Sequence, residues 1–152
     1  MSTTDIIERE AVVDAPVERV WAMLTEAEHL GRWFADAGAE IELRPGGLIE
    51  LRWTEHGTVR GRVEDVVPGR LLALRWAPYQ DPGGSEPTDG NSTRIRFSLE
   101  PAGEGTRVRV VESGFDTLDC APQQRAANRA GNSEGWDIEL GHLREHAVRQ
   151  AV

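Results

Sequence analysis

The chain has 152 residues, of which 39% are hydrophobic and 28% charged, and its 26 acidic and 17 basic residues give a net charge of -9. This ordinary globular composition excludes a disordered tail or a fibre and predicts a single domain over residues 1–152. The acidic balance argues against nucleic acid and anionic membrane as partners, because both attract basic surfaces.

All 17 basic residues are arginine. Without lysine the chain cannot form a Walker A phosphate loop, a Schiff-base site or a protein-kinase core, and the arginine bias is typical of a bacterial, GC-rich gene. The single cysteine, Cys120, excludes a disulfide framework. Residues 1–7 lack a signal-peptide pattern, and no apolar run reaches the ~20 residues of a membrane span. We therefore expect a cytoplasmic protein without membrane insertion.

The first part of the chain predicts a strand followed by two short helices. Residues 6–14 are rich in β-branched side chains, and Pro16 suits the first turn of a helix. Apolar residues recur at helical spacing over 17–24. Thr25 and Glu28 have the spacing of a capping box, which predicts that a second short helix begins there.

From residue 39 to residue 113 the hydrophobic period changes to two, and glycine or proline turns predict about six antiparallel strands. One side of each strand is apolar, whereas the other carries arginine and glutamate, so we expect one buried and one solvated face. The apolar set comprises Ile49, Leu51, Trp53, Val59, Val63, Leu72, Leu74, Trp76, Ile95, Phe97, Leu99, Val108 and Val110.

Two acidic residues break this alternation by falling on the apolar side. Glu55 adjoins a glycine turn, so we expect it to leave the sheet and be exposed. Glu112 has two interpretations. It either points into an interior cleft, where desolvation would raise its pKa, or bonds to backbone or arginine at the end of its strand.

The remaining segments are two polar connections and a terminal helix. Residues 78–91 are rich in glycine and proline and predict a mobile flap. Residues 119–132 form a second polar connection. After it, apolar residues step by four, three and four and predict an amphipathic C-terminal helix. They are Trp136, Leu140, Leu143 and Ala147.

Three motif searches yield no cofactor or metal site. His142 and His146 spell H-x-x-E-H, but the zinc site of that pattern needs a carboxylate from a later helix and only six residues follow, so we expect a solvated helix face. Cys120 has no histidine nearby in sequence and is interpreted as incidental. No G-x-G-x-x-G follows a strand, so we expect no dinucleotide.

Several ordered motifs resemble one superfamily over nearly the whole chain. They are Asp14–Thr25, Trp33-Phe34, Gly46-Gly47, Val63–Trp76, Thr106–Phe115 and Gly135-Trp136. The chain resembles the SRPBCC superfamily, which includes START domains, and within it the branch related to activators of the heat-shock protein 90 ATPase. The resemblance implies an α+β helix-grip fold, in which a curved antiparallel sheet wraps around a long C-terminal helix and leaves a cavity between them.

Four of the five tryptophans fall on predicted inward faces, where they either fill the core or line this cavity. With the resemblance, they point to a protein that binds a hydrophobic or aromatic small molecule as a carrier, sensor or sequestering protein, more readily than to an enzyme. The expected cavity wall consists of Trp33, Phe34, Trp53, Trp76, Phe97, Phe115, Trp136, Leu140 and Leu143, with Glu112 and Tyr79 orienting the ligand.

Two other functions stay open. A polyketide cyclase or aromatase would use Glu112 as general acid or base. A co-chaperone-type domain would bind a chaperone partner through an exposed apolar patch, although the lysine-free surface argues against it. A homodimer also stays open.

Overall fold

The computed structural model describes residues 6–55, 57–77 and 86–150. A seven-stranded antiparallel sheet has the order β1-β7-β6-β5-β4-β3-β2. Its strands are β1 (Ile6–Val13), β2 (Ala39–Ile41), β3 (Leu48–Trp53), β4 (Gly57–Val67), β5 (Leu71–Trp76), β6 (Thr93–Ala102) and β7 (Gly105–Ser113). The helices are α1 (Val17–Thr25), α2 (Ala27–Trp33) and α3 (Pro122–Gln150), with a short 3-10 turn, η2 (Phe115–Thr117).

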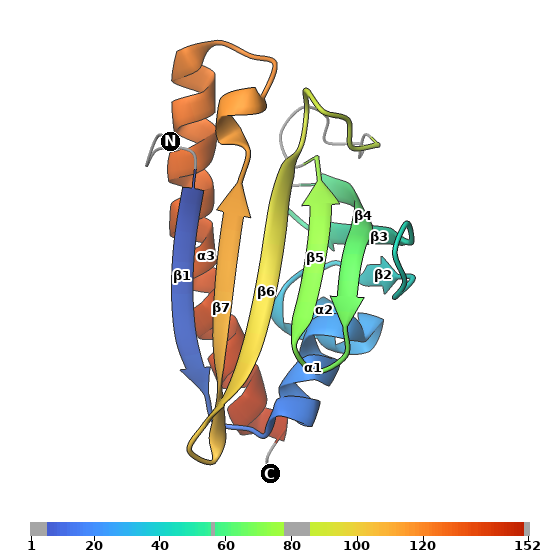
Figure 1. The fold of residues 1–152 in the computed structure, drawn as a ribbon, viewed down its shortest axis with the longest axis vertical. Coiled ribbons are helices and arrows are strands. Elements are labelled where there is room, and N and C mark those ends of the chain that lie inside the picture. Colours follow the sequence, from blue (N-terminus) through green and yellow to red (C-terminus); the bar gives the residue numbers. More distant parts are fainter. Residues whose placement is uncertain (1–5, 56, 78–85, 151–152) are drawn as a thin grey trace.

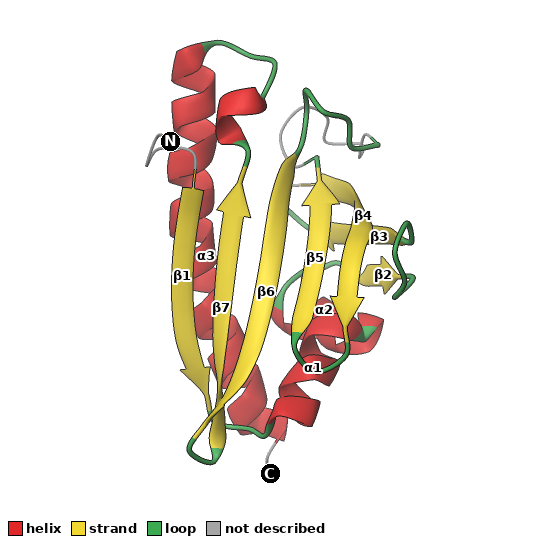
Figure 2. Cartoon of the chain, viewed as in Figure 1, coloured by secondary structure: helices red, strands yellow, loops and turns green. Residues whose placement is uncertain are grey.

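The curved sheet is covered on one face by all three helices, with the long α3 behind β1 and β7 (Figures 1 and 2). This is the predicted α+β helix-grip fold, including the two short helices after the first strand. A bulge between Val63 and Asp65 interrupts the β4–β5 pairing and locally increases the bend of the sheet. No helix in the described part of the chain is long and apolar enough to cross a membrane.

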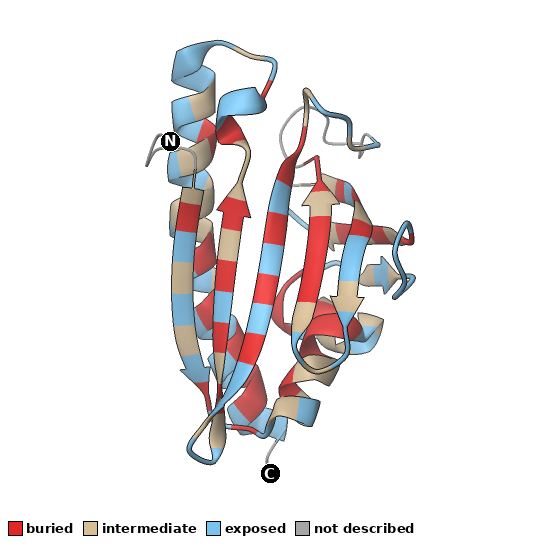
Figure 3. Ribbon diagram, viewed as in Figure 1, coloured by how far each residue is buried: buried red, intermediate tan, exposed pale blue. Residues whose placement is uncertain are grey.

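The predicted alternation of the strands is confirmed, most clearly along β6, where buried and exposed residues take turns (Figure 3). Its inward residues join one core cluster with the apolar stripe of α3. Leu143 of that stripe is fully buried, and burial of one such leucine stabilises the fold by about 1.5–3 kcal/mol. Glu55 is exposed, as expected.

One glycine allows two neighbouring strands to approach next to a tryptophan. Gly61 pairs with Trp76 across β4 and β5. A Cβ atom at position 61 would lie 2.6 Å from the carbonyl oxygen of Arg75 and 3.2 Å from Cβ of Trp76. A side chain at this inward position would therefore displace the backbone that carries Trp76.

The predicted polar connection over residues 119–132 is wrong, because α3 already begins at Pro122. This first part of the helix is largely exposed and has no apolar stripe, so hydrophobic periodicity could not reveal it. Glutamine, arginine and alanine are good helix formers, and proline is favoured in the first turn. Arg125 ties the start of the helix to the preceding chain by donating to the carbonyl oxygen of Cys120 at 2.7 Å.

The predicted capping box is also wrong. Glu26 is the residue that precedes α2, and no side chain caps this helix. Thr25 instead belongs to α1 and its hydroxyl donates to the carbonyl oxygen of Trp21 at 2.7 Å. The chain leaves one helix and enters the next within a single residue, so the threonine closes the first helix rather than opening the second.

His142 and His146 were both expected on a solvated face, and for His146 this is wrong. His142 is exposed and contacts Glu139, whereas His146 is buried between α2 and α3. There Nε2 of His146 lies 2.8 Å from Nδ1 of His29, with the two rings edge to face. One shared hydrogen satisfies both nitrogens, which links the two helices.

The predicted flap lies partly outside the described residues, which resume at residue 86. Glu86 contacts Arg62 at 2.6 Å, and Asp89 contacts Arg75 at 2.8 Å. Both ion pairs attach this segment to the solvated face of the sheet. The mobility predicted for residues 78–91 stays a prediction.

We predict that the histidine pair makes stability fall in mild acid. Burial lowers the pKa of His146, and the nearby charges of His29, Arg32 and Arg149 lower it further. The unfolded chain therefore binds the proton first, so this contribution is present above the ordinary histidine range and is lost as the pH falls from about 7 toward 5. Urea unfolding at several pH values measures the loss.

A matched pair of variants isolates this effect. His146→Gln removes the titrating ring and should flatten the pH dependence, whereas His142→Gln, on the exposed side of the same helix, should retain it. Equal pH profiles for His146→Gln and wild type would show that the buried pair is not responsible.

Candidate functional site

A cavity of about 730 Å³ lies between α3, the end of α2 and strands β3, β4 and β5. Four aromatic rings line it, those of Phe34, Trp53, Trp76 and Trp136. The other lining residues are Asp36, Thr54, Glu55, Val59, Asn132, Gly135, Ile138, Glu139 and His142. Three of the rings are buried, while Asp36, Thr54, Glu55, Ile138 and His142 are exposed. The cavity therefore has an aromatic floor and a polar rim.

The four rings form one contiguous cluster. Phe34 is nearly parallel to Trp136 and to Trp76, at centroid distances of 5.7 and 6.1 Å. Trp53 stands edge-on to Phe34 at 5.2 Å. Because the parallel rings already pack against one another, a flat ligand has no slot between them. It would instead lie over the cluster, with Trp53 as a side wall.

Every indole N–H of this cluster has an acceptor inside the protein. Nε1 of Trp53 donates to the carbonyl oxygen of Phe34 at 2.6 Å. Nε1 of Trp76 and Nε1 of Trp136 donate to the two carboxylate oxygens of Glu112, at 2.9 and 2.8 Å. These hydrogen bonds hold the rings in place. The surface that the rings present to the cavity is therefore apolar.

Glu112 is completely buried and is held by four side chains. Besides the two indoles, Asn132 donates to both carboxylate oxygens at 2.9 and 3.0 Å, and the hydroxyl of Thr93 donates at 2.5 Å. Glu112 therefore faces inward, but toward these four side chains rather than into a cleft, and its partners are neither the backbone nor an arginine. Burial raises the pKa of Glu112, and the hydrogen bonds from its four partners oppose that rise.

Glu112 does not line the cavity, because its own partners lie in front of it. It reaches the cavity only through Trp76, Trp136 and Asn132. A ligand would therefore touch the rings that Glu112 holds rather than the carboxylate itself. This geometry makes Glu112 a positioning residue.

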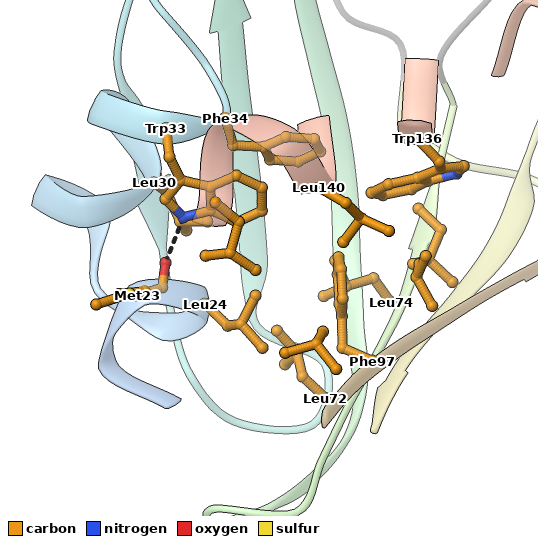
Figure 4. Close-up of a cluster of buried hydrophobic side chains, with 14 of the residues drawn as sticks. Met23, Leu24, Leu30, Trp33, Phe34, Leu72, Leu74, Phe97, Trp136 and Leu140 are labelled. Carbon is orange, nitrogen blue, oxygen red and sulfur yellow. Dashed lines mark hydrogen bonds between the residues drawn. The ribbon is translucent and has the colours of Figure 1, made fainter. Parts of the chain in front are cut away.

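The residues expected in the cavity wall fall into two groups. Phe34, Trp53, Trp76 and Trp136 line the cavity. Five others pack in the core and do not line it: Trp33, Phe97, Phe115, Leu140 and Leu143. Trp33, for example, donates to the carbonyl oxygen of Met23 at 2.7 Å, deep between α1 and α2 (Figure 4). Tyr79 lies outside the described residues.

Sequence reasoning missed the other nine lining residues of the cavity, namely Thr54, Glu55, Val59, Ile138, His142, Asp36, Asn132, Gly135 and Glu139. The last three belong to α3 and stand beside or between the residues of its apolar stripe. Gly135 carries the one signal that was available. It directly precedes Trp136 inside a helix, where glycine costs about 1 kcal/mol relative to alanine.

Gly135 leaves space that a side chain would fill. A Cβ atom at this position would meet no atom within 4 Å, so no close contact requires glycine here. Its effect is to keep the wall of the cavity open beside Trp136.

Glu139 and His142 form a hydrogen-bonded pair on the cavity rim, with Oε1 and Nδ1 2.6 Å apart. Burial raises the pKa of Glu139, while His142 opposes the rise. His146, the other histidine of the H-x-x-E-H pattern, points toward α2 instead. Within the described residues, no three His, Cys, Asp or Glu side chains group closely enough to hold a metal ion.

Comparison with known proteins identifies relatives of this chain. A family model described as Activator of Hsp90 ATPase homolog 1-like protein matches residues 14–147. A protein of Streptomyces halstedii named "Putative polyketide cyclase" is 38% identical over 65 residues, which are 42% of this chain and 60% of that protein. The aligned stretch therefore covers less than two thirds of the relative.

Two solved structures show how widely the fold occurs. DynU16, from the dynemicin biosynthetic locus, superposes with a TM-score of 0.72 at 20% identity, over 93% of this chain and 46% of its own. The chain thus spans less than half of DynU16. The Aha1 dimer of Colwellia psychrerythraea gives a TM-score of 0.69 at 20% identity, over 92% of this chain and 93% of its own. At these identities the likeness is one of fold.

We predict that Glu112 makes stability fall as the pH rises, which is opposite to the effect of the histidine pair, and that Glu112→Gln removes this fall. Because the pKa of Glu112 is raised above its ordinary value of 4.5, the stability it contributes is present below that pH and is lost as the pH rises. Glutamine cannot ionise, so the variant escapes this loss. The amide group of the glutamine points an N–H donor at the hydrogen-bond donors that surround position 112. This mismatch lowers the free energy of unfolding by about 1–3 kcal/mol at low pH.

The free energy of unfolding of the variant, relative to wild type, should therefore rise between pH 4.5 and 7. Glu104→Gln, which removes an exposed carboxylate in the β6–β7 turn, should run parallel to wild type. A Glu112→Gln profile that also runs parallel would contradict a raised pKa.

Proposed function

This chain belongs to the Activator of Hsp90 ATPase homolog 1-like family of the SRPBCC superfamily, and we propose that, as one domain over residues 1–152, it binds a hydrophobic or aromatic small molecule. The ligand occupies the cavity between the sheet and α3. Bound there, it would be carried, sensed or sequestered by the protein. No cofactor is needed for this role.

The observation that carries the proposal is an aromatic cavity floor in which the indole N–H groups already have hydrogen-bond acceptors. The indole N–H groups of Trp53, Trp76 and Trp136 all donate within the protein. What the cavity offers a ligand is therefore ring surface, which favours an apolar or aromatic body through burial and stacking. A cavity of about 730 Å³ also lies within the ~300–1,000 Å³ typical of small-molecule sites.

Gly135 supports the same interpretation. A good helix former such as alanine or leucine would improve the intrinsic stability of this helix, yet the position has no side chain. A Cβ atom at Gly131 or Gly141 of the same helix would also meet no atom within 4 Å, but of the three only Gly135 lines the cavity, so its missing side chain leaves space beside Trp136 that is open to a ligand.

A second candidate function is a cyclase-type reaction in the same cavity, favoured by the polyketide cyclase name of the Streptomyces halstedii relative. In the sequence-based hypothesis Glu112 is the general acid or base. Its place behind Trp76 and Trp136 instead favours the rim pair of Glu139 and His142 as the proton carrier, because His142 lines the cavity and Glu139 orients it.

Other partners have less support. The Aha1 structure of Colwellia psychrerythraea is a dimer, which is the basis for keeping a homodimer as a proposal for this chain. A chaperone partner would need a contiguous apolar surface, whereas the exposed large hydrophobic residues come from separate places along the chain. They are Val12, Leu43, Val67, Ile138 and Val148. The cytoplasm is the compartment we propose, from the single cysteine.

We predict that Gly135→Leu blocks ligand binding while stabilising the protein. The leucine side chain occupies the space beside Trp136, and its better helix propensity adds up to about 1 kcal/mol. Titration with the neutral dye N-phenyl-1-naphthylamine, followed by its fluorescence, should show at least about tenfold weaker binding, the equivalent of about 1.4 kcal/mol.

Gly131→Leu is the matched control. Gly131 lies one turn earlier on α3, also has no atom within 4 Å of a built Cβ, and does not line the cavity. The Gly131→Leu variant should gain the same helix stability as Gly135→Leu and keep the wild-type affinity for the dye. Equal affinities for both variants, or no binding of the dye to wild type, would count against the cavity as the binding site.

The cyclase alternative has its own test. A poly-β-ketone thioester is incubated with the protein, and aromatic product is followed by ultraviolet absorbance. If the rim pair transfers the proton, His142→Gln should lower the rate about 100-fold or more, in keeping with general acid–base catalysis. A rate no faster than in buffer, together with binding of the dye, would leave the carrier function alone.

A further inference from the structure

Three carboxylates line the rim of the aromatic cavity. Asp36 follows α2, Glu55 follows β3 and Glu139 lies on α3, so they reach the cavity from three separate elements. None of the described lining residues is an arginine, although the chain has 17 of them. Apart from His142, which is charged only when protonated, the charged groups of the described rim are therefore carboxylates.

Elsewhere many carboxylates of the described residues pair with arginine, although Glu18, Asp65 and Glu104, for example, do not. In the described part of the chain, ion pairs with arginine of 2.6 to 3.9 Å involve Glu8, Glu10, Glu28, Glu40, Glu42, Glu50, Glu64, Glu86, Asp89, Glu100, Asp137 and Glu145. None of the three rim carboxylates has such a pair within these residues. The carboxylates that face the cavity are thus among those that no arginine of the described residues neutralises.

The partners that the rim carboxylates do have leave charge available. Asp36 accepts a hydrogen bond from the backbone N–H of Thr54 at 2.8 Å, which holds it in place without cancelling its charge. Glu139 contacts His142. The pKa of Glu139 is raised mainly by burial and also by the negative charge of Asp36, so the two carboxylates repel each other. A cation bound between them would relieve that repulsion.

The floor of the cavity favours the same kind of ligand. The faces of tryptophan rings attract organic cations, most strongly where water is excluded. Phe34, Trp76 and Trp136 are buried, and all four cavity rings belong to one cluster with Trp53 at its edge. Aromatic faces below and carboxylates above are complementary to an ammonium group attached to an apolar body.

We propose that the ligand of this cavity is an organic cation, an amine or quaternary ammonium on an aromatic or other apolar body. This inference rests on the proposed function, since it names the chemical class that the same cavity takes. The apolar body lies over the ring cluster, and the positive charge lies at the rim near Asp36 and Glu139. The net charge of -9 adds long-range attraction for such a molecule.

Three probes that share one naphthalene ring and differ in charge distinguish the contribution of charge to binding affinity from that of the apolar ring. They are the cation 2-naphthylmethylammonium, the neutral 2-naphthalenemethanol and the anion 2-naphthoate. Binding is followed at pH 7.5 by nuclear magnetic resonance of the five indole N–H signals, assigned with tryptophan-to-phenylalanine variants. We expect the cation to bind at least about tenfold more tightly than the alcohol in low salt, with the difference shrinking as salt is added.

Rim variants connect the preference to particular residues. Asp36→Asn and Glu55→Gln should each lower the ratio of cation affinity to alcohol affinity by about threefold or more, because each removes one rim charge. Glu104→Gln, which makes the same charge change in the distant β6–β7 turn, should leave the ratio as it is in wild type.

The outcomes distinguish this inference from the function on which it rests. If the alcohol or the naphthoate binds as tightly as the cation, the charge preference is overturned and the apolar cavity stands. If none of the three probes shifts the signals of Trp53, Trp76 and Trp136, the binding function fails as well. A cation preference that survives both rim substitutions would overturn the role given to the carboxylates.

Discussion

The buried carboxylate of Glu112 is the constraint on which the site depends. It lies on β7 and accepts hydrogen bonds from Trp76 on β5, Thr93 on β6, and Asn132 and Trp136 on α3. A group that is costly to bury is thus satisfied by donors from two other strands and a helix at once. Loss of any of these elements would leave a buried carboxylate short of partners, so the network specifies how α3 is seated on the sheet.

The same network determines what the cavity presents. Indole rings carry one polar edge, and here the edges of two tryptophans are turned toward Glu112, away from a ligand. The exposed surface of the floor is therefore aromatic carbon. Two glycines complete the arrangement, because Gly61 lets β4 pass close to Trp76 and Gly135 leaves the helix side open. Rigid rings beside an open wall are the features of a preorganised binding site.

The strands, the last helix and the direction of their side chains were readable from sequence because they follow from local periodicity, whereas the helix-grip fold was what the family resemblance implied. A period of two with glycine turns specifies strands and their inward faces, and the inward set from Ile49 to Val110 was predicted correctly. Trp136 and the apolar stripe that begins with it likewise specified the buried side of the last helix. The first turns of that helix carried no such period, and the start at Pro122 was missed for that reason.

By itself, then, the sequence determined the fold, the inward position of the tryptophans and the unusual place of Glu112. Only the tertiary structure decided which rings border the cavity and which fill the core: Trp136 does the first, whereas Phe97, packed edge-on to it at 5.6 Å, does the second. It also decided that Glu112 lies behind the rings and that Asp36 lines the same cavity as Glu139 of α3. The physical reason is that local periodicity determines which face of its helix or strand a side chain occupies. The residues that it contacts depend on how elements distant in sequence cross one another.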